Sequence, residues 1–161
     1  MASITGIVAV GQNGAIGKAG AIPWHYPSDF KFFKAQTSGH ACVMGRRTWL
    51  SLQKRPLPDR LNIVLSRTAD FAAPPGGIVL RDKEAILLLR PYLACDLFVI
   101  GGEQVYRSFL PEIERWIVTE IPLAVEGADT FMPENFLDGF SEIETRAVEG
   151  GLRVVFYEKI A

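Results

Sequence analysis

Ile22-Pro23-Trp24-His25-Tyr26-Pro27-Ser28-Asp29-Phe30-Lys31-Phe32-Phe33 is the stretch around which the rest of the chain is organised, because it places one acid among aromatic residues. Pro27 favours the first turn of a helix and Ser28 is a capping residue, so we predict a helix over residues 27–37. On that helix Asp29 and Phe33 are four positions apart and share a face. A carboxylate beside an apolar face is a candidate functional group. The alternative is a solvated first-turn acid that the helix dipole favours.

The composition is that of a globular chain. Its 161 residues suit one domain, residues 1–161, that buries a substantial core, and 48% of them are hydrophobic and 22% charged. The formal net charge of −1 gives no electrostatic reason to expect nucleic acid or an acidic membrane as a partner. Neither the two cysteines nor His25 and His40 have the spacing of a metal site, so no metal is predicted. No signal peptide or membrane span is visible, which predicts a cytoplasmic protein.

Short apolar runs alternate with helical patterns, which is typical of an α/β fold. Expected strands are residues 4–10, 41–45, 61–66, 77–80, 96–100, 115–121, 141–145 and 152–160, the last alternating between a buried and an exposed face. Expected helices are residues 27–37, 46–52, 82–90 and 103–110, of which the third begins at a capping acid and ends at Pro91. Glu149-Gly150-Gly151 indicates a hairpin. The predicted fold is a single-domain, central, mostly parallel β-sheet flanked by helices, with an antiparallel C-terminal strand.

Residues 11–21 connect the first strand to the key stretch and contain four glycines. A long glycine-rich loop beside a candidate acid suggests a lid, and an ordinary surface loop is the alternative. The glycines lack the G-x-G-x-x-G spacing, and the strand-to-helix context is absent, so this is not a standard dinucleotide fingerprint. Residues 127–132 are also expected to form a loop.

Three arginines follow the second and third expected strands, in Gly45-Arg46-Arg47 and Ser66-Arg67. The carboxyl ends of neighbouring parallel strands meet at one edge of a sheet, where ligands bind. Arginine's planar fork suits phosphate, and the N–H groups at a helix start also attract anions. From the residues alone, however, the more economical interpretation is that these arginines are scattered surface residues with no shared role. Likewise, the residues alone favour an ordinary tight turn at Gly101-Gly102 over a ligand-binding turn.

The key stretch resembles the substrate segment of dihydrofolate reductase at Trp24, Pro27, Asp29, Phe33 and Thr37. The resemblance continues in order through Ile7-Val8-Ala9-Val10, Ile16-Gly17, Val43-Met44-Gly45-Arg46, Arg55-Pro56-Leu57-Pro58-Asp59-Arg60, Ile100-Gly101-Gly102 and Asp129-Thr130-Phe131. It covers nearly the whole chain, and an ordered series is more specific than any single motif. It implies NADPH-dependent reduction of 7,8-dihydrofolate to 5,6,7,8-tetrahydrofolate by hydride transfer, in one-carbon metabolism. NADPH is then the cofactor and dihydrofolate the small-molecule substrate, and antifolate binding and a monomeric state are expected.

The resemblance also implies roles on the substrate side. Asp29 would accept two hydrogen bonds from the pterin ring and raise the proton affinity of its N5, with a water near Trp24 delivering the proton. Thr119 resembles the hydroxyl that bridges to this acid, and Arg60 the arginine that pairs with the carboxylate of the glutamyl tail. Burial would raise the pKa of Asp29 and the helix N-terminus would lower it, and the sequence does not decide between them. The implied catalytic residues are Asp29, Trp24 and Thr119. The implied substrate-binding residues are Ile7, Val8, Ala9, Asp29, Phe30, Phe33, Leu52, Leu57, Arg60, Ile100, Tyr106 and Thr119.

We call the sheet edge that carries Arg46, Arg47 and Arg67 the arginine edge. On the cofactor side, the resemblance makes this edge a binding site for the 2′-phosphate and pyrophosphate of NADPH. Thr48 would bond a pyrophosphate oxygen, Tyr106 would close the floor between the two rings, and the Gly101–Gly102 peptide bond would be cis. The implied cofactor-binding residues are Ala9, Ile16, Gly17, Ile22, Gly45, Arg46, Arg47, Thr48, Leu65, Ser66, Arg67, Ile100, Gly101, Gly102, Glu103, Gln104, Val105 and Tyr106.

Several positions depart from the pattern of the resemblance. Ile22 stands where many bacterial members carry methionine, Phe30 where many carry leucine, and Arg47 where some carry histidine. Asp59, an acid next to Arg60, would weaken the pull of that arginine on an anionic ligand. Ala128 separates the usual glycine and aspartate, which leaves open whether Asp129 contacts the lid.

Two other functions are compatible with parts of the pattern. One is another NADPH reductase of the same fold, such as the pyrimidine reductase of riboflavin synthesis, but a ribose-phosphate substrate needs no set like Asp29, Phe33 and Arg60. The other is a non-catalytic folate or NADP binding module, which would have no need of Trp24 and Thr119 beside the acid.

Overall fold

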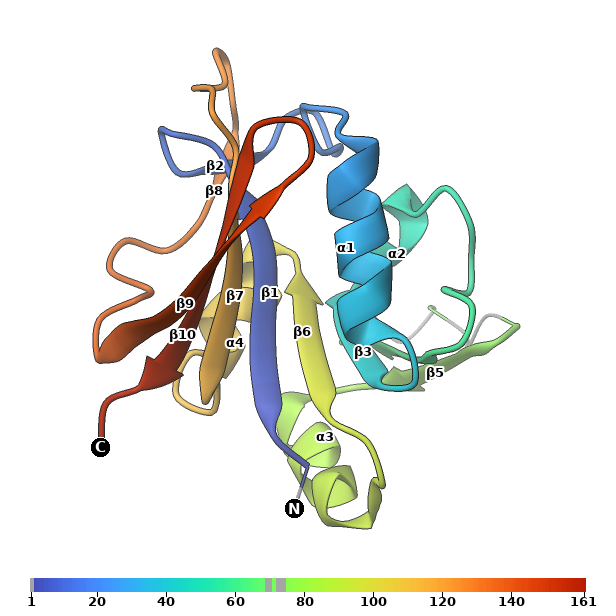
Figure 1. Ribbon diagram of the computed structural model, residues 1–161. Helices are drawn as coiled ribbons and strands as arrows, with labels where there is room; N and C mark the ends of the chain where they lie inside the picture. Colours follow the sequence, from blue (N-terminus) through green and yellow to red (C-terminus); the bar gives the residue numbers. More distant parts are fainter. Residues whose placement is uncertain (1, 69–70, 72–74) are drawn as a thin grey trace.

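Within residues 2–68, 71 and 75–161, which this computed structural model describes, eight strands form one sheet in the order β5-β4-β3-β6-β1-β7-β10-β9 (Figure 1). The strands are β1 (Ile4–Val10), β3 (Ala41–Gly45), β4 (Leu61–Leu65), β5 (Gly77–Leu80), β6 (Leu97–Gly101), β7 (Arg115–Glu120), β9 (Phe140–Val148) and β10 (Leu152–Lys159). All pairings among β1 and β3 to β7 are parallel. Only β10 pairs antiparallel with β7 and β9 among the described strands of this sheet. The predicted fold class is confirmed.

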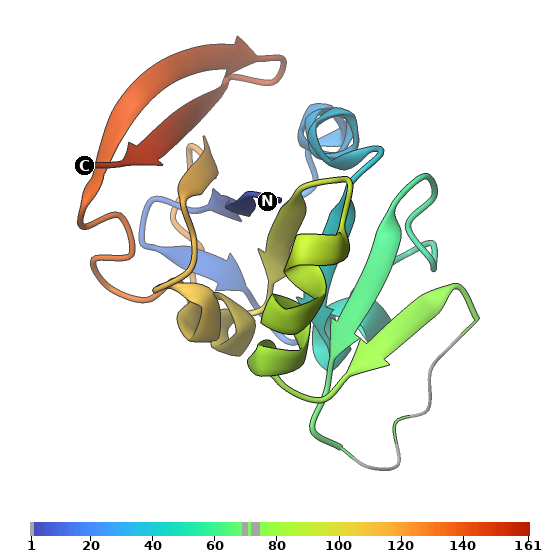
Figure 2. The same cartoon turned by 90° about the horizontal axis from the view of Figure 1, so that it is seen from below.

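Helices cover both faces of the sheet (Figure 2). They are α1 (Pro27–Thr37), α2 (Arg46–Ser51), α3 (Lys83–Leu89) and α4 (Glu103–Phe109), with the short 3₁₀ helix η1 (Arg90–Tyr92) after α3. On the face that α1 and α2 cover, the core includes Ile7, Cys42, Trp49, Phe98, Ile117 and Val154. On the face that α3 and α4 cover, it includes Ile4, Val8, Ile86, Tyr106, Phe109 and Trp116. None of the described helices is long and apolar enough to cross a membrane.

Strand β1 illustrates how the sequence alternates between these two cores. Ile7 lies on the α1 face, whereas Ile4 and Val8 lie on the α4 face. At Gly6, an added Cβ would come within 2.4 Å of the Trp116 ring. Glycine is therefore required there, because the fully buried indole occupies the space of a side chain.

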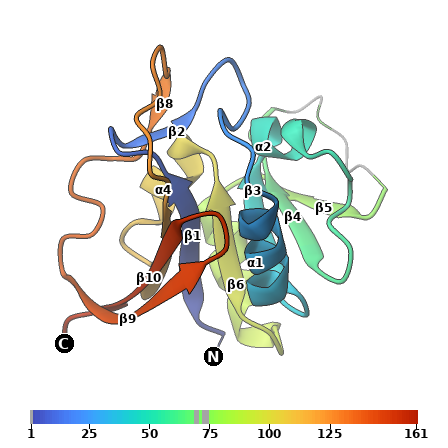
Figure 3. The same ribbon diagram turned by 45° about the horizontal axis from the view of Figure 1, so that its top comes forward.

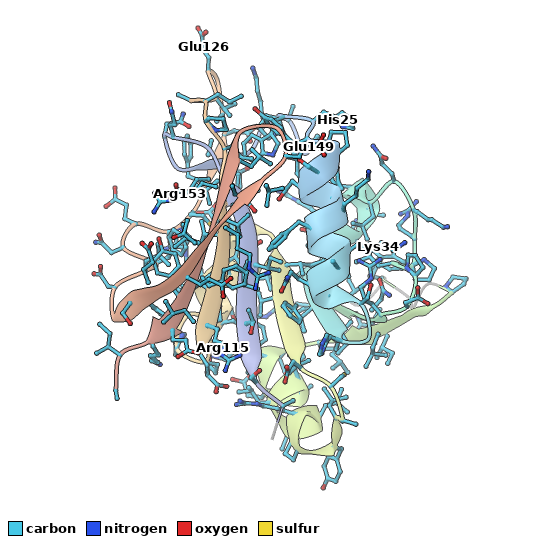
Figure 4. The ribbon with its side chains drawn as sticks, in the orientation of Figure 1. His25, Lys34, Arg115, Glu126, Glu149 and Arg153 are labelled. Carbon is cyan, nitrogen blue, oxygen red and sulfur yellow. The ribbon has the colours of Figure 1, made fainter. Side chains whose placement is uncertain are left out.

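Helix α1 spans the predicted residues, but the prediction that Ser28 caps it was wrong. Tyr26 is the N-cap residue and makes no side-chain capping bond. The hydroxyl of Ser28 instead donates to the carbonyl of Glu149 in the β9–β10 turn, and Figure 4 shows Glu149 beside the start of α1. Local sequence preference assigned the Ser28 side chain to the helix end, but its hydrogen-bond partner lies 121 positions away in the chain.

Helix α3 follows the prediction, but a 3₁₀ helix that the sequence did not predict comes after it. Asp82 caps this helix as expected, since its Oδ1 accepts from the backbone N–H of Ala85 at 2.8 Å. The α-helix ends at Leu89, before Pro91 as predicted, but the chain continues through Pro91 as the 3₁₀ helix η1. Proline has no N–H to lose in the first turn of a new helical segment, so it is tolerated there.

Two expected loops contain short strands. β2 (Ala15–Gly17), within the glycine-rich segment, pairs antiparallel with β8 (Thr130–Phe131). Strands of two and three residues are too short to show a periodic pattern, and their pairing joins segments that lie far apart in the sequence. In β10 the predicted alternation fails at Val155, which is fully buried like its neighbour Val154.

Candidate active site

Asp29 lies in the first turn of α1 and faces Thr119 of β7 across the sheet surface. Thr119 is paired with Ala9 of β1, so this hydroxyl sits at the carboxyl end of the central parallel strands. Burial raises the pKa of Asp29, and the polar Thr119 side chain nearby opposes that change without cancelling it. Burial therefore prevails, which the sequence left undecided. A half-buried acid with a raised pKa in such a position is a candidate functional group.

Tyr106 of α4 contacts strand β1 from the opposite face of the sheet. Its hydroxyl donates to the carbonyl oxygen of Ile7 at 2.7 Å. Burial, and after it the negative charge of Asp29, raise the pKa of Tyr106, so the phenol stays neutral. Val8, by contrast, packs into the core of the α4 face. From the side of the sheet that carries Asp29, only its backbone is accessible.

Apolar and aromatic side chains extend from Asp29 along α1. Phe33 packs on the α1-face core together with Leu52, Leu57 and Ile100. Phe30 is 44% exposed, and its ring centroid lies 5.8 Å from that of His25. The predicted substrate residues thus form a wall that is half-buried at Phe33 and open to solvent at Phe30. Trp24 is half-buried in the segment that precedes α1.

Arg60 stands at the far end of this wall. Its guanidinium carbon lies 5.8 Å from the centroid of the Phe33 ring, and Nη1 donates to Thr37 Oγ1 at 3.2 Å. Its Nε donates to the carbonyl of Pro58 at 2.8 Å. The preceding Asp59 has a φ of 62°, a left-handed conformation that favours glycine. Arg60 is therefore held in place by neutral partners.

The three predicted phosphate-binding arginines do share one edge of the sheet. Gly45 at the end of β3 is paired with Leu65 at the end of β4, so Arg46, Arg47 and Arg67 all leave the sheet at the same level. All three are exposed. The guanidinium of Arg46 lies 5.7 Å from the centroid of the Phe71 ring, a cation–π contact.

The Gly101–Gly102 turn lies next to this edge, and its peptide bond is cis, as expected. An added Cβ on Gly102 would meet only Thr48 Oγ1, at 3.6 Å, and Gly101 has a φ of 125°. A Cβ on Gly45 would come within 3.2 Å of Val105. The turn therefore presents bare backbone beside a hydroxyl, with space in front of it. In α4, which follows, Glu103 pairs with Arg107 at 3.1 Å and Gln104 is exposed.

The glycine-rich segment is tied to the chain around β8 (Figure 3). The backbone N–H of Ala19 donates to Asp129 Oδ2 at 2.9 Å, and that of Asp129 donates to the Gly17 carbonyl at 3.2 Å. Lys18 Nζ donates to the carbonyl of Glu126 at 2.9 Å. Asp129 therefore contacts the lid despite the additional alanine. Ile16 packs against the core, and Ile22, at the end of the segment, is 54% exposed.

Sequence reasoning missed three residues around the site. Arg81 donates to three backbone carbonyls of the loop after β4. It follows β5, so the same argument about strand ends could have placed it at the arginine edge. Phe71 gave no signal in the sequence, and neither did the contact of Ser28 with the β9–β10 turn.

The sequence model of the family described as dihydrofolate reductase matches residues 3–155. The chain belongs to the dihydrofolate reductase family. It is 43% identical over 134 residues to a dihydrofolate reductase of Neisseria gonorrhoeae, covering 83% of this chain and 81% of the relative. It is 44% identical over 131 residues to one of Mycobacterium tuberculosis, covering 79% and 78%. A dihydrofolate reductase from Enterococcus faecalis, solved in complex with NADP(H) and RAB-propyl, superimposes with a TM-score of 0.87 at 32% identity, covering 98% of this chain and 96% of that one.

Proposed function

We propose that this protein reduces 7,8-dihydrofolate to 5,6,7,8-tetrahydrofolate with NADPH, a reaction of one-carbon metabolism. One observation carries the proposal: in a chain of the dihydrofolate reductase family, Asp29 is a half-buried acid with a raised pKa that faces Thr119 beside the carboxyl end of β1. A solvated first-turn acid, the alternative reading of this residue, would not have its pKa raised by burial.

Asp29 holds the pterin ring in register. A carboxylate accepts two parallel hydrogen bonds, and the ring presents an amino group and a ring N–H side by side. Phe33 and Phe30 enclose the ring and the aminobenzoyl group, with Leu52 and Leu57 extending the apolar surface. Arg60 receives the carboxylate of the glutamyl tail, since the groups that accept its hydrogen bonds, the Pro58 carbonyl and the Thr37 hydroxyl, are neutral.

The reaction also requires a proton at N5 of the pterin. The Asp29 charge raises the proton affinity of N5, and its effect is strong because the carboxylate is partly removed from water. Thr119 keeps the carboxylate oriented. Trp24, at the mouth of the site, orders the water that delivers the proton.

The residues at the arginine edge fit NADPH, which supplies a hydride when bound. Arg46, Arg47 and Arg67 are exposed, with guanidinium groups suited to phosphate oxygens. The bare backbone at Gly101–Gly102 lets a ring approach closely, and the Thr48 hydroxyl beside it can donate to a pyrophosphate oxygen. The lid of residues 11–21 excludes water from the nicotinamide end. The cytoplasmic location, the monomeric state, the extent of the domain and the binding of antifolates stay predictions.

The decisive experiment is to follow the loss of NADPH absorbance when dihydrofolate is added to the purified protein. We expect turnover that depends on both compounds. Oxidation of NADPH with the pyrimidine substrate of riboflavin synthesis, and not with dihydrofolate, would contradict the proposal. Tight binding of both compounds without turnover would instead identify a binding module.

A further inference from the structure

Arg81 makes an arrangement that the proposed function does not use. Its Nη1 donates to the carbonyl oxygens of Ser66, at 3.3 Å, and Thr68, at 2.6 Å. Its Nη2 donates to the carbonyl of Phe71 at 3.2 Å. Ser66 and Thr68 are the two neighbours of Arg67 in the chain, so a single guanidinium nitrogen holds the backbone on both sides of that arginine.

Other contacts complete this arrangement. The N–H of Ser66 donates to the Leu80 carbonyl at 3.0 Å, directly before Arg81, and the N–H of Thr68 donates to Ser66 Oγ at 3.3 Å. Phe71, the third residue that Arg81 holds, carries the ring against which Arg46 lies. Arg81 thus connects the backbone of Arg67 and the aromatic partner of Arg46.

The bonding of Arg81 indicates a positioning role, since both Nη1 protons are committed to carbonyls. Arg67, Arg81, Asp82 and Glu84 line a surface cavity of about 620 Å³, in which two acids balance two cations. The Asp82 carboxylate is engaged in capping α3. Because the charges that line this cavity cancel, a phosphate binds there only where a guanidinium is positioned to contact its oxygens. The position of Arg67 therefore matters more for phosphate binding than the net charge of the cavity.

We propose that Arg81 is a positioning residue that sets the preference for NADPH over NADH by fixing the backbone that presents Arg67 to the 2′-phosphate. This proposal rests on the proposed function. The cofactor without the 2′-phosphate makes no use of Arg67, so loss of Arg81 should weaken NADPH binding and leave NADH binding nearly unchanged.

The test compares Arg81→Met, Arg81→Lys, Arg67→Met and the double variant Arg81→Met/Arg67→Met with the unaltered protein. KM and kcat are measured with NADPH and with NADH, dihydrofolate being saturating. We expect Arg81→Met to raise KM for NADPH about tenfold, as for one charge-assisted contact, with KM for NADH and both kcat values within about twofold. Arg81→Lys keeps the charge but cannot reach the carbonyls with a planar fork, so it should resemble Arg81→Met. In the Arg67→Met background, Arg81→Met should have no further effect on the ratio of the two KM values.

Arg153→Met is the matched control, because Arg153 pairs with Glu120 and Glu142 at the other side of the sheet. It should leave both KM values unchanged. The proposal is overturned if Arg81→Met weakens NADPH and NADH equally, if Arg81→Lys restores the preference, or if the effects of Arg67 and Arg81 add in the double variant. If the unaltered protein used both cofactors equally well, the arginine edge of the proposed function would fail, and this proposal with it.

Discussion

Asp29→Asn should leave the fold intact and remove most dihydrofolate turnover near neutral pH. The amide has the size of the carboxylate, so the packing of α1 hardly changes. The substitution removes the negative charge that orients the pterin and favours its protonated form. Asparagine still accepts one hydrogen bond, but its NH₂ group opposes the donors of the ring.

The size of the effect follows from the surroundings of Asp29. An unpaired polar group in a partly buried site costs about 1–3 kcal/mol. Two unit charges about 5 Å apart, at an effective dielectric constant of about 20, attract each other by about 3 kcal/mol. The two effects together amount to about 4–6 kcal/mol, and since about 1.4 kcal/mol corresponds to a factor of ten in rate, kcat/KM should fall by roughly 10³–10⁴-fold. Cofactor affinity should be nearly unchanged, because other residues hold NADPH.

The same substitution should increase the free energy of unfolding, because the pKa of Asp29 is raised in the folded state. Burial raises the pKa of Asp29 in the folded state, so folding costs free energy at any pH where the group is ionised when unfolded. This cost grows as the pH rises from the unfolded pKa through the folded pKa, and it is fully present at neutral pH. Replacing the acid with a neutral amide removes it, so Asp29→Asn should have a higher Tm at pH 7 than the unaltered protein.

Asp96→Asn is the matched control, since it makes the same chemical change with the opposite expected sign. Burial raises the pKa of Asp96, but hydrogen bonds from Ser3, one of them at 3.0 Å from its backbone N–H, and the charges of His40 and Arg115 together bring it below its usual value. That stabilisation is present above the unfolded pKa and is lost as the pH falls through the folded pKa. Asp96→Asn should therefore lower Tm at pH 7 and leave turnover unchanged.

The assay is kcat/KM for dihydrofolate against pH for the three proteins, with NADPH affinity and thermal melting measured on each. The residual activity of Asp29→Asn should increase as the pH falls, because solvent then supplies the proton. The gap to the unaltered protein should narrow below the raised pKa of Asp29, where that protein also loses the charge. If Asp29→Asn matches the unaltered protein at neutral pH, Asp29 is only a first-turn acid and the proposed mechanism is wrong.

Three further predictions concern the cofactor edge, the lid and the core. Arg67→Ala should reduce the preference for NADPH over NADH by about 10–100-fold, the value of one charge-assisted contact; comparable efficiencies before and after the change would count against the arginine edge. NADPH should increase hydrogen-exchange protection across residues 11–21, and Asp129→Ala, which removes the bond to the Ala19 N–H, should lower protection there without cofactor; unchanged protection in both experiments would reduce this segment to a connector. Gly6→Ala should destabilise the protein by about 1–3 kcal/mol, because the new Cβ overlaps the Trp116 ring; a urea midpoint equal to that of the unaltered protein would contradict this packing.

Much of this molecule was predictable because local patterns coincide with tertiary needs. The β-branched runs became the parallel strands, since a strand covered on both faces must be apolar throughout. The arginine edge followed from the rule that parallel strands end together, and the pairing of Gly45 with Leu65 confirmed it. The resemblance to the dihydrofolate reductase family assigned Asp29 to the pterin, and residues alone would not have done so.

Only the tertiary structure decided the features that depend on distant partners. The pKa of Asp29 required knowing whether the sheet buries it, since burial and the helix N-terminus act in opposite directions. Ser28 was assigned to the wrong partner, because its bond to Glu149 spans the chain and has no local pattern. The pairing of β2 with β8, the contact of Asp129 with the lid, and the three carbonyls held by Arg81 share this property. Sequence periodicity reports which face of an element is apolar, whereas single polar contacts between remote loops are set by where the folded sheet brings those loops together.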